Sequence, residues 1–202
     1  MYAQVIKLFL IKGVAFFAYL NERYLWLWHI LLSGGNCAMN RINCSIMPLI
    51  QRNPQAAAIV AGSEKYPDIH GIVRFYTMKN GTLVYADVNG LPYAGNRCSQ
   101  EIFGFHIHGG DSCTGNAEDP FADAGKHFDK DNCPHPFHSG DLPPLFGNNG
   151  KAVSIFLTNR FSVDEIIGRT MIIHGSPDDF TTQPSGNSGM KIACGVIRAV
   201  RQ

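Results

Sequence analysis

Short stretches of alternating apolar and polar residues dominate the chain from Ala57 onward, and this period-two pattern predicts β-strands. The clearest case is HGIVRFYT at 70–77, which Lys79-Asn80-Gly81 separates from TLVYADV at 82–88. Alternation on both sides of an Asn-Gly turn signal predicts a β-hairpin.

Further strands are predicted at EIFGFHIH (101–108), KAVSIFLT (151–158), GRTMIIHG (168–175) and KIACGVIRAV (191–200). Turn-rich polar segments separate them, the longest at 109–150. A loop of this length is unusual in a compact domain unless a metal or a disulfide holds it. Several short strands with such loops favour an all-β fold, an antiparallel sandwich or barrel.

The first 46 residues are different, because they begin with an apolar and aromatic stretch. Asn21, Glu22 and Arg23 divide that stretch into runs of roughly 9 to 16 residues, whereas a membrane-spanning helix needs about 20. The order of charged and small residues also departs from a secretory signal.

Two interpretations of residues 1–46 stay open. In the first, these residues are a leader or a membrane anchor, and the protein is expected outside the cytoplasm. Alternatively, translation starts near Met47 and the protein is cytoplasmic. In either case residues 47–202 form the working domain.

Charge and cysteine spacing exclude several function classes. The 17 Lys and Arg nearly balance the 16 Asp and Glu, so there is no general basic surface for nucleic acid. The six cysteines form no CxxC pair, which argues against a zinc finger or a thioredoxin motif. Their wide spacing fits a disulfide better, with buried free thiols as the alternative.

Two histidines in GFHIH are placed by strand alternation. Phe103, Phe105 and Ile107 share one face, which is expected to enter the core, and His106 and His108 share the other. The two imidazoles would then lie about 7 Å apart along the strand, a separation across which two ligands can converge on one metal. Two exposed histidines without a ligand are the ordinary alternative.

The other histidines favour the metal interpretation. Six of the eight lie between positions 106 and 174. HPFHSGD places His135, His138 and Asp141 at steps of three, and Pro136 disfavours a helix there. One more ligand would complete a tetrahedral zinc site, and His127 is the candidate. Solvated loop histidines remain the alternative.

These segments resemble the copper/zinc superoxide dismutase family. The matching pieces, in chain order, are VRFYTMKNGTLVYADVNGLP, GFHIH, AGKHF, HSGDL, GRTMIIHGSPDD and GNSGMKIACGVI. They extend from about residue 58 to the end of the chain. The resemblance implies a Greek-key antiparallel β-barrel with long metal-binding and electrostatic loops.

The resemblance also implies cofactors, ligands and a disulfide. The copper ligands would be His106, His108, His127 and His174. The zinc ligands would be His127, which bridges the two metals, and His135, His138 and Asp141. Asp178 would join a copper histidine to a zinc histidine without touching metal. Cys113 and Cys194 would form a disulfide, and Cys98 and Cys133 either form a second one or leave Cys133 as a thiol near zinc.

The implied activity is that of an antioxidant oxidoreductase, which disproportionates superoxide to O2 and H2O2 by copper redox cycling. His127 and Lys191 would be its catalytic residues. Lys191 stands where the family usually has Arg, so the positive charge is kept but the planar two-pronged donor is lost. We therefore expect reduced activity that falls with added salt. A dismutase-like metal-binding protein with little turnover is the alternative, and the sequence leaves both monomer and homodimer open.

Overall fold

A computed structural model describes residues 6–11, 14–19, 48, 50–96 and 98–201 of the chain. It divides into two compact units, residues 1–52 and 53–202. In the first unit, strand β1 (Ile6–Ile11) pairs antiparallel with β2 (Val14–Tyr19). The polar break at 21–23 and Met47 lie outside the described residues. No helix in the described ranges is long and apolar enough to cross a membrane.

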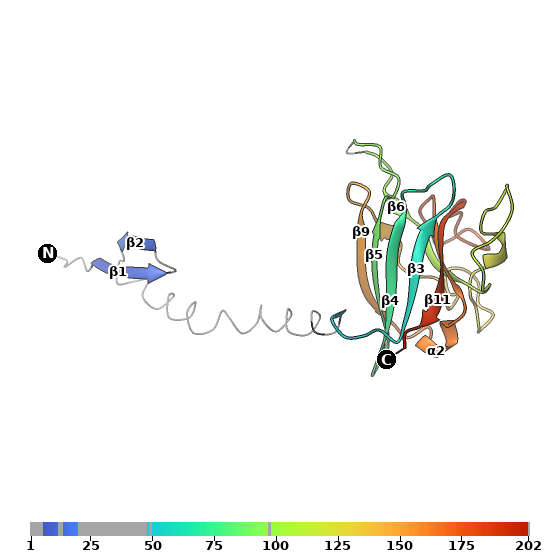
Figure 1. Ribbon diagram of the computed structural model, residues 1–202, viewed down its shortest axis with the longest axis horizontal. Coiled ribbons are helices and arrows are strands. Elements are labelled where there is room, and N and C mark those ends of the chain that lie inside the picture. The colour runs from blue at the N-terminus through green and yellow to red at the C-terminus, as the bar shows by residue number, and fades with distance from the viewer. Residues whose placement is uncertain (1–5, 12–13, 20–47, 49, 97, 202) are drawn as a thin grey trace. The chain divides into compact units, whose positions relative to one another are not determined.

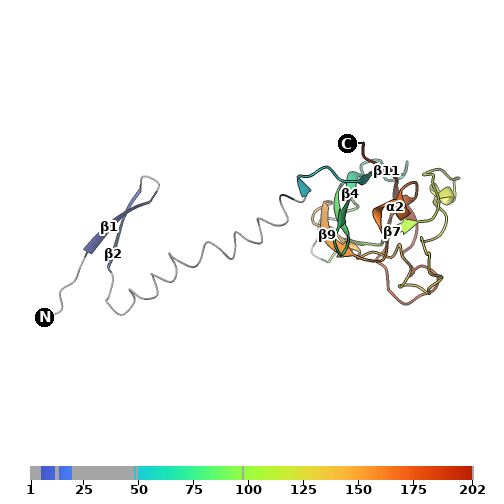
Figure 2. The ribbon, with the colours of Figure 1, turned by 90° about the horizontal axis from the view of Figure 1, so that it is seen from below.

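The second unit is built on one antiparallel sheet of seven strands that curves around a single core (Figures 1 and 2). Its order is β7-β10-β11-β3-β4-β5-β9. The strands are β3 (Ala56–Gly62), β4 (His70–Met78), β5 (Gly81–Asn89), β7 (Phe105–His108), β9 (Ala152–Thr158), β10 (Thr170–His174) and β11 (Lys191–Ala199).

The remaining elements are small. Strand β6 (Ile102–Phe103) pairs with β8 (Leu145–Phe146), and the helical pieces are a 3-10 turn η2 (Ala122–Ala124) and one turn of α-helix, α2 (Val163–Ile166). Strands β3, β4 and β5 follow one another, and β11 returns over a long connection to lie beside β3. This is the Greek-key arrangement. The predicted all-β antiparallel fold is confirmed.

The predicted hairpin is formed by β4 and β5. Met78 pairs with Gly81, so Lys79 and Asn80 make the turn. Gly81 has φ 137°, and a Cβ at this position would collide with the carbonyl of Thr158, so the turn requires glycine here.

The predicted strand at 101–108 is interrupted at Gly104. Residues before it pair with β8, and residues after it pair with β10. The Gly104 N–H donates to the Ser176 carbonyl at 2.8 Å instead of continuing a ladder. The predicted alternation still holds, because Phe103, Phe105 and Ile107 are fully buried in the core.

A loop covers the outer face of β10 and β11, on the side away from the main core. Phe121 and Ala124 from this loop pack against Ile172 of β10 and Cys194 of β11 in a small apolar cluster. The Cys113–Cys194 disulfide joins the same two layers, as predicted. The loop therefore covers the outer face of this part of the sheet, and side chains there are buried between sheet and loop.

Candidate metal centre

Strand β7 and the loop that follows it place the histidines. His106 and His108 lie on β7 opposite Ile172 and Thr170 of β10. The returning loop pairs with the other edge of β7 through two isolated bridges, His108 with His127 and His106 with Asp141. His106 and His108 do point away from the core side, with ring centres 6.5 Å apart, but the loops leave them only 0% and 2% exposed.

The first cluster contains His106, His108, His127 and His174, each of which offers a ring nitrogen within 4.8 Å of the others. Nδ1 of His108 lies 2.8 Å from the Gly125 carbonyl, and Nδ1 of His174 lies 3.2 Å from the Gly189 carbonyl. Because a carbonyl only accepts, each Nδ1 carries the proton. Both Nε2 atoms then present lone pairs to each other across 3.3 Å, which is unfavourable unless a cation lies between them.

The other two histidines complete this donor set. Nε2 of His106 lies 2.7 Å from the Asp178 carboxylate, so it carries the proton and leaves Nδ1 as a lone pair. That Nδ1 is buried without a hydrogen-bond partner, and so is Nε2 of His127. Four converging imidazole nitrogens suit copper.

The second cluster contains His127, His135, His138 and Asp141. The Nδ1 atoms of the three histidines lie 2.7, 3.1 and 3.1 Å from Asp141 carboxylate oxygens. Nε2 of His135 faces the Asp178 carboxylate at 2.9 Å, so its Nδ1 is a lone pair aimed at a negatively charged oxygen. A bound cation removes this conflict. Three nitrogens and one carboxylate oxygen are a zinc donor set.

Two residues connect the clusters. His127 belongs to both, with Nδ1 beside Asp141 and Nε2 free toward the first cluster. Asp178, which is buried, bridges Nε2 of His106 and Nε2 of His135. Burial would raise the pKa of Asp178, but hydrogen bonds from His106, the Phe180 N–H and His135 bring it down to about 2.

Burial keeps the first cluster in the form that binds metal. Three of its histidines have lowered pKa values, and desolvation is the main cause in each. The pKa of His106 is lowered, that of His108 is well below its usual value, and that of His174 is about 3. These imidazoles are therefore neutral near pH 7, and their lone pairs are available as ligands.

A cavity of about 490 Å³ opens onto both clusters. Lys191, which the family resemblance assigns to guiding the anion, lines this cavity, but its ammonium is already paired. Nζ lies 2.5 Å from Asp119 Oδ2 and donates to the Phe121 carbonyl at 3.0 Å. The charged side chains that line the cavity are two lysines and three acids, namely Lys126, Lys191, Glu118, Asp119 and Asp129.

The contact between Lys191 and Asp119 could not be predicted, because the two residues are 72 positions apart and no motif joins them. Of the two alternatives for Cys98 and Cys133, the second disulfide is wrong, since both residues are free thiols. Cys98 is exposed between β5 and β6, and Cys133 is half-buried in the loop that carries the second cluster. Cys133 is not part of the donor set of that cluster.

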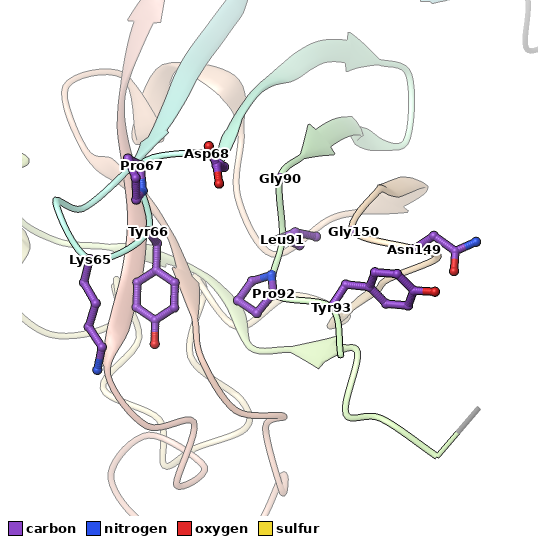
Figure 3. Close-up of a pocket in the computed structure, with 10 residues that line it drawn as sticks. All are labelled: Lys65, Tyr66, Pro67, Asp68, Gly90, Leu91, Pro92, Tyr93, Asn149 and Gly150. Atoms are coloured by element: carbon purple, nitrogen blue, oxygen red, sulfur yellow. The ribbon is translucent and has the colours of Figure 1, made fainter. Parts of the chain in front are cut away.

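A second hollow of about 430 Å³ lies between the loops at one end of the sheet (Figure 3). Tyr66 and Pro92 line it together with Tyr93, and Lys65 and Asp68 provide its charged groups. It contains no histidine or cysteine, so the metal-binding chemistry belongs to the cavity that holds the two clusters.

Comparison with known proteins assigns the chain to a family. The sequence profile of copper/zinc superoxide dismutase matches residues 69–197. A superoxide dismutase [Cu-Zn] from Deinococcus radiodurans is 35% identical over 150 residues, which cover 65% of this chain and 79% of the relative. Superoxide dismutase [Cu-Zn] 2 from Aquifex aeolicus is 29% identical over 146 residues, with 65% and 80% covered. Superoxide dismutase [Cu-Zn] A from Xenopus laevis is 33% identical over 160 residues, with 71% and 96% covered. The chain therefore belongs to the copper/zinc superoxide dismutase family.

Proposed function

We propose that the protein is a superoxide dismutase, which converts two superoxide ions and two protons into O2 and H2O2. The observation that carries this proposal is the pair of buried donor sets that share His127 beside one open cavity. Bound copper would supply a centre that alternates between two oxidation states, while zinc is not redox-active.

The roles of the ligands follow from which nitrogens lack protons. Copper would be held by Nδ1 of His106 and by the Nε2 atoms of His108, His127 and His174. Zinc would be held by Asp141, by Nδ1 of His135, and by the Nδ1 atoms of His127 and His138, which would first lose the proton that faces Asp141. Nε2 of His127 is buried without a hydrogen-bond partner among the described residues, so it is free to bind copper. Lys191 would attract and orient the anionic substrate at the cavity wall.

The test is a superoxide-consumption assay on protein loaded with copper and zinc. We expect superoxide to disappear faster than it does spontaneously, and we expect His174→Ala to lose both copper and activity. His70→Ala is the matched control, because His70 is exposed and its ring forms a hydrogen bond with the Asp68 carbonyl, outside both histidine clusters. Its copper content and activity should equal those of the unsubstituted protein.

A second candidate function is metal binding without useful turnover. The pairing of Lys191 with Asp119 and the excess of acids around the cavity favour it, because both weaken the attraction of an anion. In this case the metal-loaded protein would leave superoxide at its spontaneous rate of decay, and that result would exclude the dismutase function.

A further inference from the structure

The contact between Lys191 and Asp119 lies directly beside the first histidine cluster. Lys191 begins β11 and pairs in the sheet with His174, at a β-bulge. Its side chain is 13% exposed, and its ammonium is held by one carboxylate and one backbone carbonyl. The positive charge of Lys191 at the cavity is therefore already paired with the negative charge of Asp119.

The Asp119 carboxylate is fixed in place before any ligand arrives. Oδ1 accepts from the Phe121 N–H at 3.1 Å, and Oδ2 accepts from Lys191. The loop that carries Asp119 is anchored nearby, since Cys113 precedes it by six residues and is bonded to Cys194, three residues after Lys191. A carboxylate held in this way pays little entropy to bind the lysine, so the ion pair is stronger than one between mobile surface groups.

We propose that Asp119 is a positioning residue that holds Lys191 at the cavity wall and competes with the anionic ligand for its ammonium. Anion binding at the cavity is then weaker than an unpaired lysine would allow. The inference rests on the proposed function only in that the natural ligand is an anion. It is separate from turnover, because any small anion that enters the cavity meets the same competition.

Azide is a suitable probe, because it is a small anion whose binding to copper is followed by visible absorption. In protein loaded with copper and zinc, Asp119→Asn should lower the azide Kd by about threefold to tenfold, the effect of one unit charge at a partly solvated site. The gain in azide affinity should shrink as salt is added, because salt screens the charge of Lys191 at the open cavity. Asp119→Ser, whose hydroxyl still accepts from the Phe121 N–H, should behave in the same way.

Two controls separate this mechanism from a general charge effect. Glu118→Gln removes a neighbouring acid from the same cavity but leaves the Lys191 pair, and it should change the azide Kd by less than about twofold. In a Lys191→Gln background, Asp119→Asn should have almost no effect. An equal effect of Asp119→Asn in both backgrounds would mean that Asp119 acts on the anion directly, and would overturn the proposal.

The remaining outcomes are also decisive. Asp119→Asn and Asp119→Ser proteins that keep their metals and bind azide no more tightly than the unsubstituted protein would overturn the inference, whatever the dismutase assay gives. If azide binding tightens as expected while metal-loaded protein leaves superoxide to decay spontaneously, the inference stands and the proposed function fails. Metal content and melting temperature, measured on each variant, identify loss of folding.

Discussion

In four of the clustered histidines, the hydrogen-bond partner of one ring nitrogen decides that the other nitrogen is free to bind metal. Backbone carbonyls of Gly125 and Gly189 fix the protons of His108 and His174. The Asp178 carboxylate fixes those of His106 and His135 together. One buried acid therefore orients a ligand in each of the two proposed metal sites.

Asp178→Asn should weaken both sites. An amide has one accepting oxygen, whereas the two Nε2–H groups that face Asp178 need two. We expect the affinity for both metals to fall by about 10-fold to 100-fold, measured by competition with a chelator. Asp131→Asn, the same change at an exposed position of the metal-binding loop, should leave both affinities unchanged. Equal affinities for the two variants would contradict the bridging role of Asp178.

At the residue scale, the sequence and the family resemblance pointed to the donor groups and to Asp178 between them. They did not indicate the backbone partners of the histidines or the partner of Lys191. Strand alternation and motif spacing indicated six of the seven residues that the structure gathers into the two clusters, and the family resemblance added His174. The proton positions of His108 and His174, in contrast, depend on backbone carbonyls, which no residue type in the sequence reveals. The neutralisation of Lys191 depends on an acid 72 residues away, and only the folded chain brings the two together.

At the scale of elements, Arg160 after β9 holds the loop that carries the second cluster. One of its guanidinium nitrogens, Nη1, lies 2.8, 3.1 and 3.3 Å from the carbonyls of Pro136, His138 and Asp141. Two of these residues belong to the proposed zinc site. Arg160 is therefore expected to fix the backbone on which the zinc ligands are presented.

Arg160→Met keeps the aliphatic stem but removes the donors, so the three loop carbonyls lose the guanidinium that connects them. We expect zinc affinity to fall by about tenfold, measured by competition with a chelator. Arg198→Met is the control, because Arg198 is exposed on β11, and it should bind zinc like the unsubstituted protein. A zinc affinity that Arg160→Met leaves intact would show that the loop holds its shape without this contact.

Glu165 links the one-turn helix α2 to the same loop and gives a pH-dependent prediction. Hydrogen bonds from the Ser162 backbone and from Lys130 lower its pKa to about 2. A lowered pKa stabilises the fold at pH values above the unfolded pKa, and the gain is lost as pH falls toward 2. Glu165→Gln should therefore cost about 0.5–1 kcal/mol at pH 7, a range reduced because the carboxylate is 39% exposed.

Urea unfolding at several pH values measures this effect. The difference between Glu165→Gln and the unsubstituted protein should shrink between about pH 4.5 and pH 2. Glu64→Gln, at an exposed loop position, should show no comparable difference. A Glu165→Gln difference that is independent of pH would assign the effect to packing rather than to charge.

Strands were predicted well where apolar and polar residues alternate regularly. They were predicted poorly where one stretch of chain pairs first with one neighbouring strand and then with another. The β4–β5 hairpin lies where the pattern placed it. The break at Gly104 and the two-residue strand β8 were not predicted, because each depends on which neighbour the chain meets rather than on its own sequence. Helix α2 was not predicted either, and it lies between two of the predicted strands.

At the scale of the whole molecule, the long polar loop keeps its shape because it is attached at several points. The sequence predicted that a loop at 109–150 needs a metal or a disulfide. In the structure the Cys113–Cys194 bond joins it to β11, and isolated bridges at His127 and Asp141 join it to β7. The loop forms part of the wall of the metal-binding cavity. Its attachment is therefore needed to form the site as well as to stabilise the fold.

Removing the disulfide tests how much the fold depends on this attachment. The bond joins residues 81 apart, and on the chain-entropy model its loss from a loop of this size costs about 4.5 kcal/mol, within the range of 2–5 kcal/mol typical of native disulfides. The Cys113→Ser/Cys194→Ser variant should lose stability in that range. Urea unfolding of metal-free protein is the appropriate measurement, because bound metals would add their own stabilisation.

Cys98→Ser is the matched control, because Cys98 is an exposed free thiol and its loss should change stability by less than about 0.5 kcal/mol. A reducing agent should destabilise the unsubstituted protein and the Cys98→Ser variant equally, and it should not affect the double variant. If the double variant unfolds at the same urea concentration as the unsubstituted protein, the apolar cluster around Phe121 and the bridges to β7 are sufficient to hold the loop. The disulfide would then not be needed to attach it.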